Sequence, residues 1–182
     1  PPPELLAGVS HVLVSVPPDE AGDPMLDALG AALAGADHLQ WIGYLSTTGV
    51  YGDTDGAWVD ELTPPAPGQG RSRRRLAAEN AWLELWRTHG RPVEVFRLAG
   101  IYGPGRSPFA RLRAGTARRI VKPGQVFSRI HVDDIAAVLA ASLARPEPGA
   151  AYNVCDDRPA PPEDVLAFAA ELIGLPPPPA VA

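Results

Sequence analysis

The sequence has one cysteine, Cys155, in 182 residues, which excludes a disulfide bond within the chain. A protein without disulfides suits a reducing compartment, so we expect a cytoplasmic location. No apolar run approaches the roughly 20 residues that a membrane-spanning helix needs, and no secretory signal is visible at the N-terminus. We therefore expect no membrane partner.

Positive charge is in deficit, with 16 Lys and Arg against 21 Asp and Glu and a formal net charge of −5. A chain of this sign has no overall attraction to nucleic acid or to an anionic membrane surface. The one basic cluster, RSRRR from Arg71 to Arg75, is local. Neither a nucleic-acid partner nor a metal site is expected.

The composition that remains is that of a soluble globular protein, with 46% hydrophobic and 20% charged residues. The length allows one ordinary domain with a sizeable core. Because the chain opens in Pro-rich sequence without a methionine, we expect it to be a fragment or to lack its first segment.

Short apolar runs alternate with helical patterns along the chain. Strands are expected over residues 11–16, 41–45, 93–98, 118–121, 126–132 and 151–155, and helices over residues 24–33, 71–89, 108–114, 133–144 and 161–173. Asp23 is expected to cap the first helix and Gly35 to end it. This alternation predicts an α/β fold with a mostly parallel sheet and right-handed crossovers.

Three segments between or within these elements have distinct expectations. Residues 53–70 form a long irregular loop, a length that is more often functional than not. Residues 99–105 read as a turn punctuated by glycines after the third long strand. The helix over 133–144 is apolar on most faces, so we expect it to be well buried.

The stretch WIGYLSTTGVYG begins as a buried strand at Trp41 and ends in the hydroxyls of Ser46, Thr47 and Thr48. In an open parallel sheet, ligands bind at the carboxyl ends of the strands. The same hydroxyls also serve to satisfy backbone groups where a strand ends. On this stretch alone, both interpretations stay open.

Three separated stretches, LSTTGVYGD, FRLAGIYGPGR and VFSRIHVDDIAAVLAASL with the later AAYNV, follow one pattern in order. Together they resemble the NAD-dependent epimerase/dehydratase family, the extended short-chain dehydrogenase/reductases, over roughly residues 8–174. The resemblance implies a Rossmann-like, doubly wound, mostly parallel sheet with helices on both faces, incomplete at its N-terminus. It implies one partial NAD(P)-binding domain over residues 1–182, in which about residues 104–182 form a smaller substrate-side region.

The family's glycine-rich phosphate turn is absent from this sequence. Residues 68–70 and 103–105 begin like G-x-G-x-x-G, but Arg73 and Pro108 stand where the last glycine belongs. The chain therefore resembles the part of the fold that follows the cofactor-phosphate unit. The resemblance implies NAD or NADP as cofactor, without deciding between them.

The resemblance implies that Thr47 holds a substrate hydroxyl or carbonyl, with Thr48 on the substrate and Ser46 on the cofactor. The family's Tyr-x-x-x-Lys pair, a proton donor and its partner, falls on Arg71 and Arg75. Arginine keeps its proton near neutral pH, so the usual proton relay is interrupted. We retain Thr47, Arg75, Arg71 and Ser72 as catalytic candidates. The alternative for the run from Arg71 to Arg75 is a solvated basic turn paired with local acids such as Glu79.

The resemblance also implies cofactor contacts from the backbone of Ala99, Gly100, Ile101 and Tyr102, next to the nicotinamide. Arg129 and His131 fall in the region that lies near the nucleotide part of the substrate in relatives, and Arg129 suits a diphosphate. The alternative for His131 is a structural histidine with its hydrogen bonds satisfied.

Three functions remain open. The first is an NAD(P)-dependent epimerase, dehydratase or reductase for a nucleotide-sugar-like substrate, atypical at Arg71 and Arg75. The second is a non-catalytic NAD(P)-binding or sensor protein, and the third is an inactive fragment. A homodimer through the helix that carries Trp82 and Trp86 is a further expectation, although both tryptophans fit a core equally well.

Overall fold

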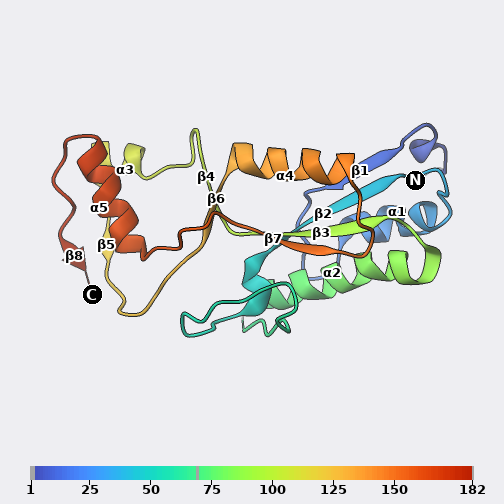
Figure 1. Ribbon diagram of the computed structural model, residues 1–182, viewed down its shortest axis with the longest axis horizontal. Coiled ribbons are helices and arrows are strands. Elements are labelled where there is room, and N and C mark those ends of the chain that lie inside the picture. The colour runs from blue at the N-terminus through green and yellow to red at the C-terminus, as the bar shows by residue number, and fades with distance from the viewer. Residues whose placement is uncertain (1–2, 69, 182) are drawn as a thin grey trace.

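The computed structural model describes residues 3–68 and 70–181 (Figure 1). Gln69, within the loop expected over residues 53–70, lies outside the described residues. The central sheet has the strand order β1-β2-β3-β7, with every ladder parallel. Its strands are β1 (His11–Val14), β2 (Trp41–Thr47), β3 (Val93–Leu98) and β7 (Ala151–Val154). The expected parallel α/β fold is confirmed.

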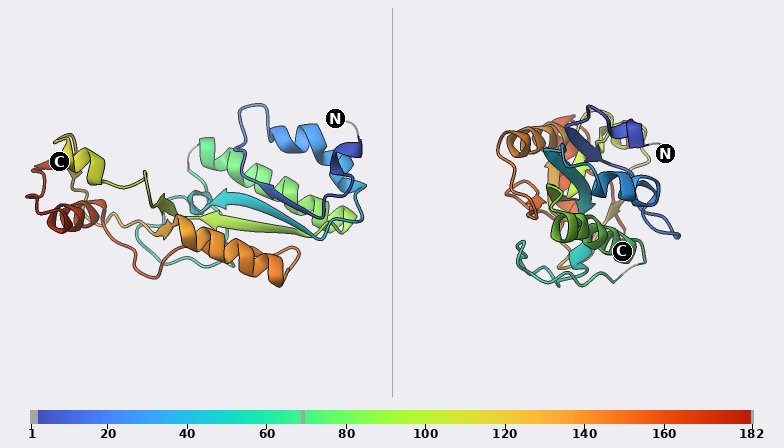
Figure 2. Two further views of the ribbon diagram at one scale, coloured as in Figure 1. Left: turned by 90° about the horizontal axis from the view of Figure 1, so that it is seen from above. Right: turned by 90° about the vertical axis from the view of Figure 1, so that its right-hand side faces the viewer.

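Helices lie on both faces of this sheet (Figure 2). On one face lie α1 (Pro24–Ala34) and α2 (Gly70–His89), around a core that includes Leu33, Tyr44 and Trp82. On the other face lies α4 (Val132–Ala144), over a second core with Trp41 and Phe96. This is the doubly wound arrangement expected for the fold.

The cap of α1 follows the local sequence signal. The Asp23 carboxylate accepts hydrogen bonds from the backbone N–H groups of Met25 at 2.9 Å and Leu26 at 3.1 Å, and Gly35 ends the helix. The second carboxylate oxygen of Asp23 accepts from the indole N–H of Trp82 at 3.0 Å. The cap therefore also fixes α1 against α2.

The segment after β3 differs from the expected turn. Gly100–Tyr102 forms a strand, β4, which pairs in parallel with β6 (Arg129–His131). Ile101 lies opposite Ile130 at the centre of this pair, and Ile130 is part of the second core. The expectation of a turn is thus wrong for these three residues, because their partner lies outside the local sequence.

A smaller group of elements lies beyond the β4–β6 pair (Figure 1). It consists of α3 (Phe109–Arg113), β5 (Arg119–Ile120), α5 (Pro162–Leu172) and β8 (Ala180–Val181). Its own small core includes Leu112, Leu166 and Ala170. Within residues 104–182, these elements form the separate group, whereas α4 and β7 lie with the main sheet.

The expectation that the apolar helix over residues 133–144 is well buried is wrong. In α4 the buried residues are Ile135 and Ser142, whereas Val132 and Leu143 are exposed. Next to it, β1 is the edge strand of the sheet, and its Leu13 is 51% exposed. Neither α4 nor any other helix in the described part of the chain is long and apolar enough to cross a membrane.

Candidate active site

The carboxyl ends of β2 and β3 place the expected site residues side by side. Thr47, the last residue of β2, lies opposite Leu98, the last residue of β3. Ala99 follows directly and donates its backbone N–H to the Val154 carbonyl at 3.0 Å, which holds it against β7. Thr47 and Ala99 therefore both lie at the carboxyl ends of the parallel strands, which is where open α/β sheets bind their ligands.

The Thr47 hydroxyl has a defined orientation. Its oxygen accepts the backbone N–H of Gly49 at 3.1 Å and so caps the short 3-10 turn η2 (Thr48–Tyr51). Since a hydroxyl donates one proton and accepts through two lone pairs, and no acceptor for the Thr47 proton lies within residues 3–68 and 70–181, that proton can bind a ligand oxygen.

Ser72, in the first turn of α2, approaches the same point. A Cβ atom on residue 49 would lie 3.2 Å from Ser72 Oγ and 3.4 Å from Thr47 Oγ1. Both hydroxyls thus lie beside Gly49. The two catalytic candidates that carry hydroxyls are brought together.

Ser46 and Thr48 flank Thr47 but differ from it in setting. The Ser46 hydroxyl is buried and donates to a Glu79 carboxylate oxygen at 2.8 Å. Thr48 begins η2 and is half-buried. Of the three consecutive hydroxyls, the one at Ser46 is already bound to an internal acceptor.

Arg71 and Arg75 lie one helical turn apart at the start of α2. Arg71 is exposed, whereas Arg75 Nη1 donates to Tyr44 Oη at 3.1 Å and to the Leu45 carbonyl at 3.0 Å. Burial raises the pKa of Tyr44 to about 12, against the opposing charge of Arg75. Arg75 is therefore anchored on β2, and Tyr44 keeps its proton near neutral pH.

The β4–β6 pair brings the remaining expected residues together. Gly100 lies opposite Arg129, and Tyr102 lies opposite His131 with ring centres 5.2 Å apart in an edge-to-face arrangement. Arg129 Nη1 donates to the carbonyls of Phe127 at 2.9 Å and Ala160 at 3.0 Å. Cofactor and substrate candidates thus share one two-stranded ladder.

His131 has a structural partner here. Its Nδ1 accepts the backbone N–H of Asp133 at 3.2 Å, so the imidazole caps the N-terminus of α4. The side chain of Asp133 lies 3.6 Å from the same nitrogen. This arrangement corresponds to the structural alternative considered for His131.

A buried ion pair behind the strand ends was not anticipated. Arg97 of β3 binds Glu79 of α2 through two of its nitrogens, and its third reaches Tyr51 Oη at 2.7 Å. The sequence does carry a signal for it, because an arginine inside the apolar strand VEVFRL requires a buried acceptor. The partner's identity depends on how α2 packs.

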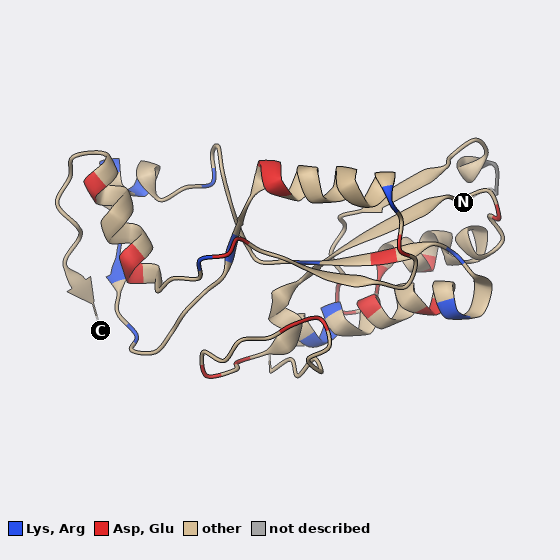
Figure 3. Cartoon of the chain, in the orientation of Figure 1, with Lys and Arg blue, Asp and Glu red and all other residues tan. Residues whose placement is uncertain are grey.

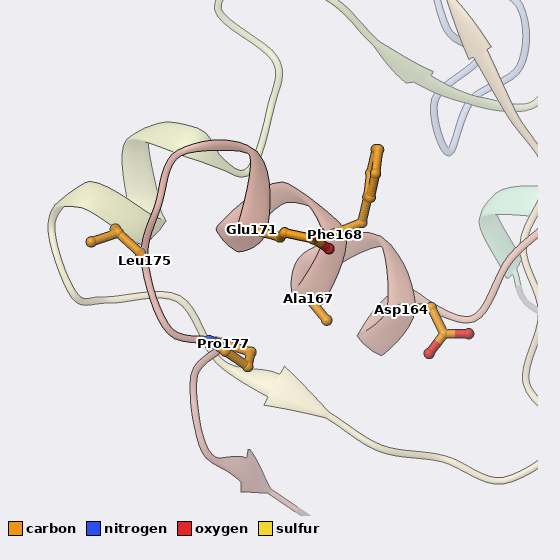
Figure 4. Close-up of a pocket in the computed structure, with 6 residues that line it drawn as sticks. All are labelled: Asp164, Ala167, Phe168, Glu171, Leu175 and Pro177. Carbon is orange, nitrogen blue, oxygen red and sulfur yellow. The ribbon is translucent and has the colours of Figure 1, made fainter.

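Neither a surface hollow on α5 nor a metal site adds to the candidate active site. A shallow hollow of about 540 Å³ lies on α5 in the smaller group, lined by Asp164, Ala167, Phe168, Glu171, Leu175 and Pro177 (Figure 4). None of the residues expected in the site lines it. Within residues 3–68 and 70–181, no group of three or more His, Cys, Asp or Glu side chains is arranged to hold a metal ion.

Comparison with known proteins gives relatives along most of the chain. It is 35% identical over 147 residues to Protein YeeZ of Escherichia coli K12, covering 79% of this chain and 50% of that protein. A solved protein of unknown function from Silicibacter pomeroyi is 62% identical with a TM-score of 0.91, covering 97% of this chain and 62% of the other. The chain thus spans about half the length of the curated relatives that it matches.

A more distant likeness concerns the fold alone. The dTDP-glucose 4,6-dehydratase of Bacillus anthracis, solved with NAD, superposes with a TM-score of 0.80 at 21% identity, over 98% of this chain and 62% of that protein. The NAD dependent epimerase/dehydratase family model matches residues 25–155, which include β2, α2, β3 and α4. With the strand ends, the parallel sheet and these relatives in agreement, the chain belongs to the NAD dependent epimerase/dehydratase family.

Proposed function

We propose that the chain provides the substrate-facing side of an NAD- or NADP-dependent epimerase, dehydratase or reductase that acts on a nucleotide-sugar-like substrate. The observation that carries the proposal is the convergence of Thr47 and Ser72 at the carboxyl end of β2. Two neighbouring hydroxyls at the end of a strand suit a substrate carbonyl or hydroxyl, to which each can form a hydrogen bond. Arg71 and Arg75 add positive charge at the same helix start, where they favour an oxygen that becomes negative during the reaction.

The residues present fit one end of a dinucleotide. Ala99 and Gly100 present small residues next to Thr47, which lets a flat ring approach the backbone. The turn between β1 and α1, which contains Pro17 and Pro18, offers no glycine-rich cradle for a diphosphate. When bound, the nicotinamide supplies hydride transfer, and this chain's residues orient the substrate against it.

A complete cofactor site therefore calls for a further α/β unit on the β1 edge. Two features favour that position: β1 is paired in the described residues with β2 alone, and Leu13 of β1 is 51% exposed. A parallel strand next to β1 and a helix beside α4 would extend the sheet and cover this side chain. We assign the group of α3, β5, α5 and β8, by contrast, to the substrate side.

Charge supports an anionic substrate on that side. From residue 95 to residue 132 the sequence has no Asp or Glu, and its basic residues include Arg106, Arg111, Arg113, Arg118 and Lys122. These side chains are spread over α3, β5 and the segments that join them to the sheet (Figure 3). Arginines suit the diphosphate of a nucleotide sugar, which is doubly charged and accepts many hydrogen bonds.

One observation favours the second candidate, a non-catalytic NAD(P)-binding or sensor protein. Arg75 is held by Tyr44 and Leu45, and Arg71 cannot act as a proton donor near neutral pH. No tyrosine replaces the family's proton donor at the start of α2. Binding without turnover is the outcome that this candidate predicts.

Substitution of Thr47 tests the catalytic proposal. Turnover is measured with a panel of nucleotide sugars and both nicotinamide cofactors, by absorbance and by product analysis. Thr47→Val keeps the shape of the side chain and removes its hydroxyl, so we expect turnover to fall by roughly 100-fold. Thr47→Ser keeps the hydroxyl and is expected to retain most activity, and Thr54→Val controls for loss of a loop hydroxyl.

The panel separates the candidates. Full turnover in Thr47→Val would remove Thr47 from the site. A wild-type protein that binds a nicotinamide dinucleotide but turns over no member of the panel would establish the sensor candidate instead.

A further inference from the structure

We infer that Tyr51 is a positioning residue that fixes the loop over residues 53–68 at the carboxyl end of β2. This rests on the proposed function in so far as that strand end is the proposed site. Tyr51 ends η2, four residues after Thr47, and is 4% exposed. Its ring is interior, and its hydroxyl contacts three separate parts of the chain.

The chemistry of the partners fixes which hydrogen bonds Tyr51 Oη accepts and which it donates. Arg97 Nη1 donates to it at 2.7 Å, and a guanidinium cannot accept. The phenolic proton must therefore point away from Arg97, toward the Asp60 carbonyl and Asn153 Oδ1, each at 2.9 Å. One hydroxyl thus joins β3, the loop and β7.

The other end of this chain of hydrogen bonds lies directly behind the proposed site. Arg97 binds Glu79, and Glu79 accepts the Ser46 hydroxyl at 2.8 Å. Burial disfavours the guanidinium charge, but the hydrogen bonds and charge of Glu79, together with Tyr51, outweigh this and raise the pKa of Arg97 above its ordinary value. Tyr51 is therefore linked through the Arg97–Glu79 ion pair to Ser46, the residue before Thr47.

The loop has a second polar tether beside the first. The Glu61 carboxylate accepts the backbone N–H of Asn153 at 2.7 Å. Between the two tethers, the Asp60 carboxylate accepts the N–H groups of Leu62 at 3.1 Å and Thr63 at 2.9 Å, which gives the loop a defined local shape. Asn153 thus contacts Tyr51 through its side chain and Glu61 through its backbone.

The largest apolar side chains of the loop do not hold it in place, although the smaller Val59, Pro65 and Pro67 are half-buried. Its two large apolar side chains, Trp58 and Leu62, are 80% and 90% exposed. At the opposite end, the turn at Asp55 and Gly56 lies against the carbonyl of Gly124, 3.6 Å from where a Cβ of residue 56 would lie. The loop thus spans from the main sheet to the segment before β6, and its position depends on the polar tethers at Tyr51 and Glu61.

Hydrogen–deuterium exchange of the whole chain tests the inference. In Tyr51→Phe, one oxygen is lost and the ring is kept. We expect exchange of the amides of Leu62, Thr63 and Asn153 to be roughly tenfold faster, the factor for one lost hydrogen bond, while α1 exchanges as in the wild type. Tyr152→Phe is the matched control, because the Tyr152 hydroxyl contacts only the Glu147 carboxylate within the described residues, at 3.3 Å.

A second variant covers the case in which Tyr51→Phe does not fold. Glu61 is exposed, so Glu61→Ala removes the other tether without opening the core. It is expected to speed exchange at the same three amides. Unchanged loop exchange in the variants that fold, or an equal increase in Tyr152→Phe, would overturn the inference.

Kinetics separates this inference from the proposed function. If the wild type turns over a nucleotide sugar, a displaced loop is expected to raise KM several-fold in Tyr51→Phe with little change in kcat. An unchanged KM together with faster loop exchange would overturn the role in substrate positioning. A wild type that binds a nicotinamide dinucleotide but turns over no nucleotide sugar would count against the proposed function, and loop exchange would still decide whether Tyr51 holds the loop.

Discussion

The hydroxyls of Thr47 and Ser72 both lie beside Gly49. The backbone of Gly49 is not in the left-handed region, so Gly49→Ala is expected to fold, with a change in the free energy of unfolding below about 1 kcal/mol. The added Cβ would lie 3.2 Å from Ser72 Oγ, which must move. We therefore expect substrate turnover to fall by at least roughly tenfold, measured alongside urea unfolding.

Gly30→Ala is the matched control for this change. Gly30 lies within α1 and has open space where its Cβ would be. Alanine there is expected to stabilise the protein by about 1 kcal/mol without affecting turnover. Equal turnover in Gly49→Ala and the wild type would contradict the two-hydroxyl site.

Single residues could be predicted from the sequence where the signal is local. Asp23 caps α1 as expected, because the cap depends on the two residues that follow. The settings of Ser46 and Arg75 could not be predicted, since their partners Glu79 and Leu45 lie about 30 residues away in the chain. The roles assigned to Thr47, Thr48 and Ser72 remain predictions for experiment.

At the scale of elements, α4 is attached to the sheet by a buried polar contact. The indole N–H of Trp41 donates to Ser142 Oγ at 2.8 Å, and Ser142 Oγ donates to a Glu94 carboxylate oxygen at 2.5 Å. Glu94 also accepts the backbone N–H of Glu147 at 2.7 Å, just after the helix. These contacts fix both the position and the end of α4.

Ser142→Ala is expected to lower the free energy of unfolding by roughly 2–4 kcal/mol, because it leaves a buried donor and a buried acceptor unpaired. Equilibrium unfolding in urea measures the effect. Leu143→Ala, on the exposed side of the same helix, is the control and is expected to change stability by less than about 1 kcal/mol. A Ser142→Ala protein as stable as the control would show that packing alone holds α4.

The sequence predicts elements well where periodicity is sustained and poorly where pairing is distant. The bounds of β3 match the expectation, and those of α2 differ by one residue at the start. The short strand β4 was missed because its ladder depends on β6, almost 30 residues later. The expectation that α4 is well buried was wrong, because an apolar pattern shows which side chains a helix can bury and not which other elements cover them.

At the scale of the whole molecule, large apolar side chains are exposed on the main sheet and its helices, on the loop over residues 53–68 and in the smaller group of elements. In the main group of elements, Leu13 of β1 and Leu143 of α4 are both exposed. The alternation of strands and helices predicted the mostly parallel α/β sheet, and the family resemblance implied its doubly wound form, but neither indicated which apolar side chains would be exposed. The exposure of Leu13 could be predicted only from the strand order, because that order makes β1 an edge strand.

An exposed apolar side chain on an unpaired edge strand favours association between chains. We therefore expect the 182-residue chain to self-associate in a concentration-dependent way. Leu13→Lys places a charge on that edge and is expected to lower the average mass measured by light scattering. Leu172→Lys is the matched control, since Leu172 is 60% exposed on α5, in the smaller group of elements. An equal effect of both variants would mean that net charge, rather than the β1 edge, governs association, whereas an effect of Leu13→Lys alone would mark this edge as the surface on which a further strand can pair.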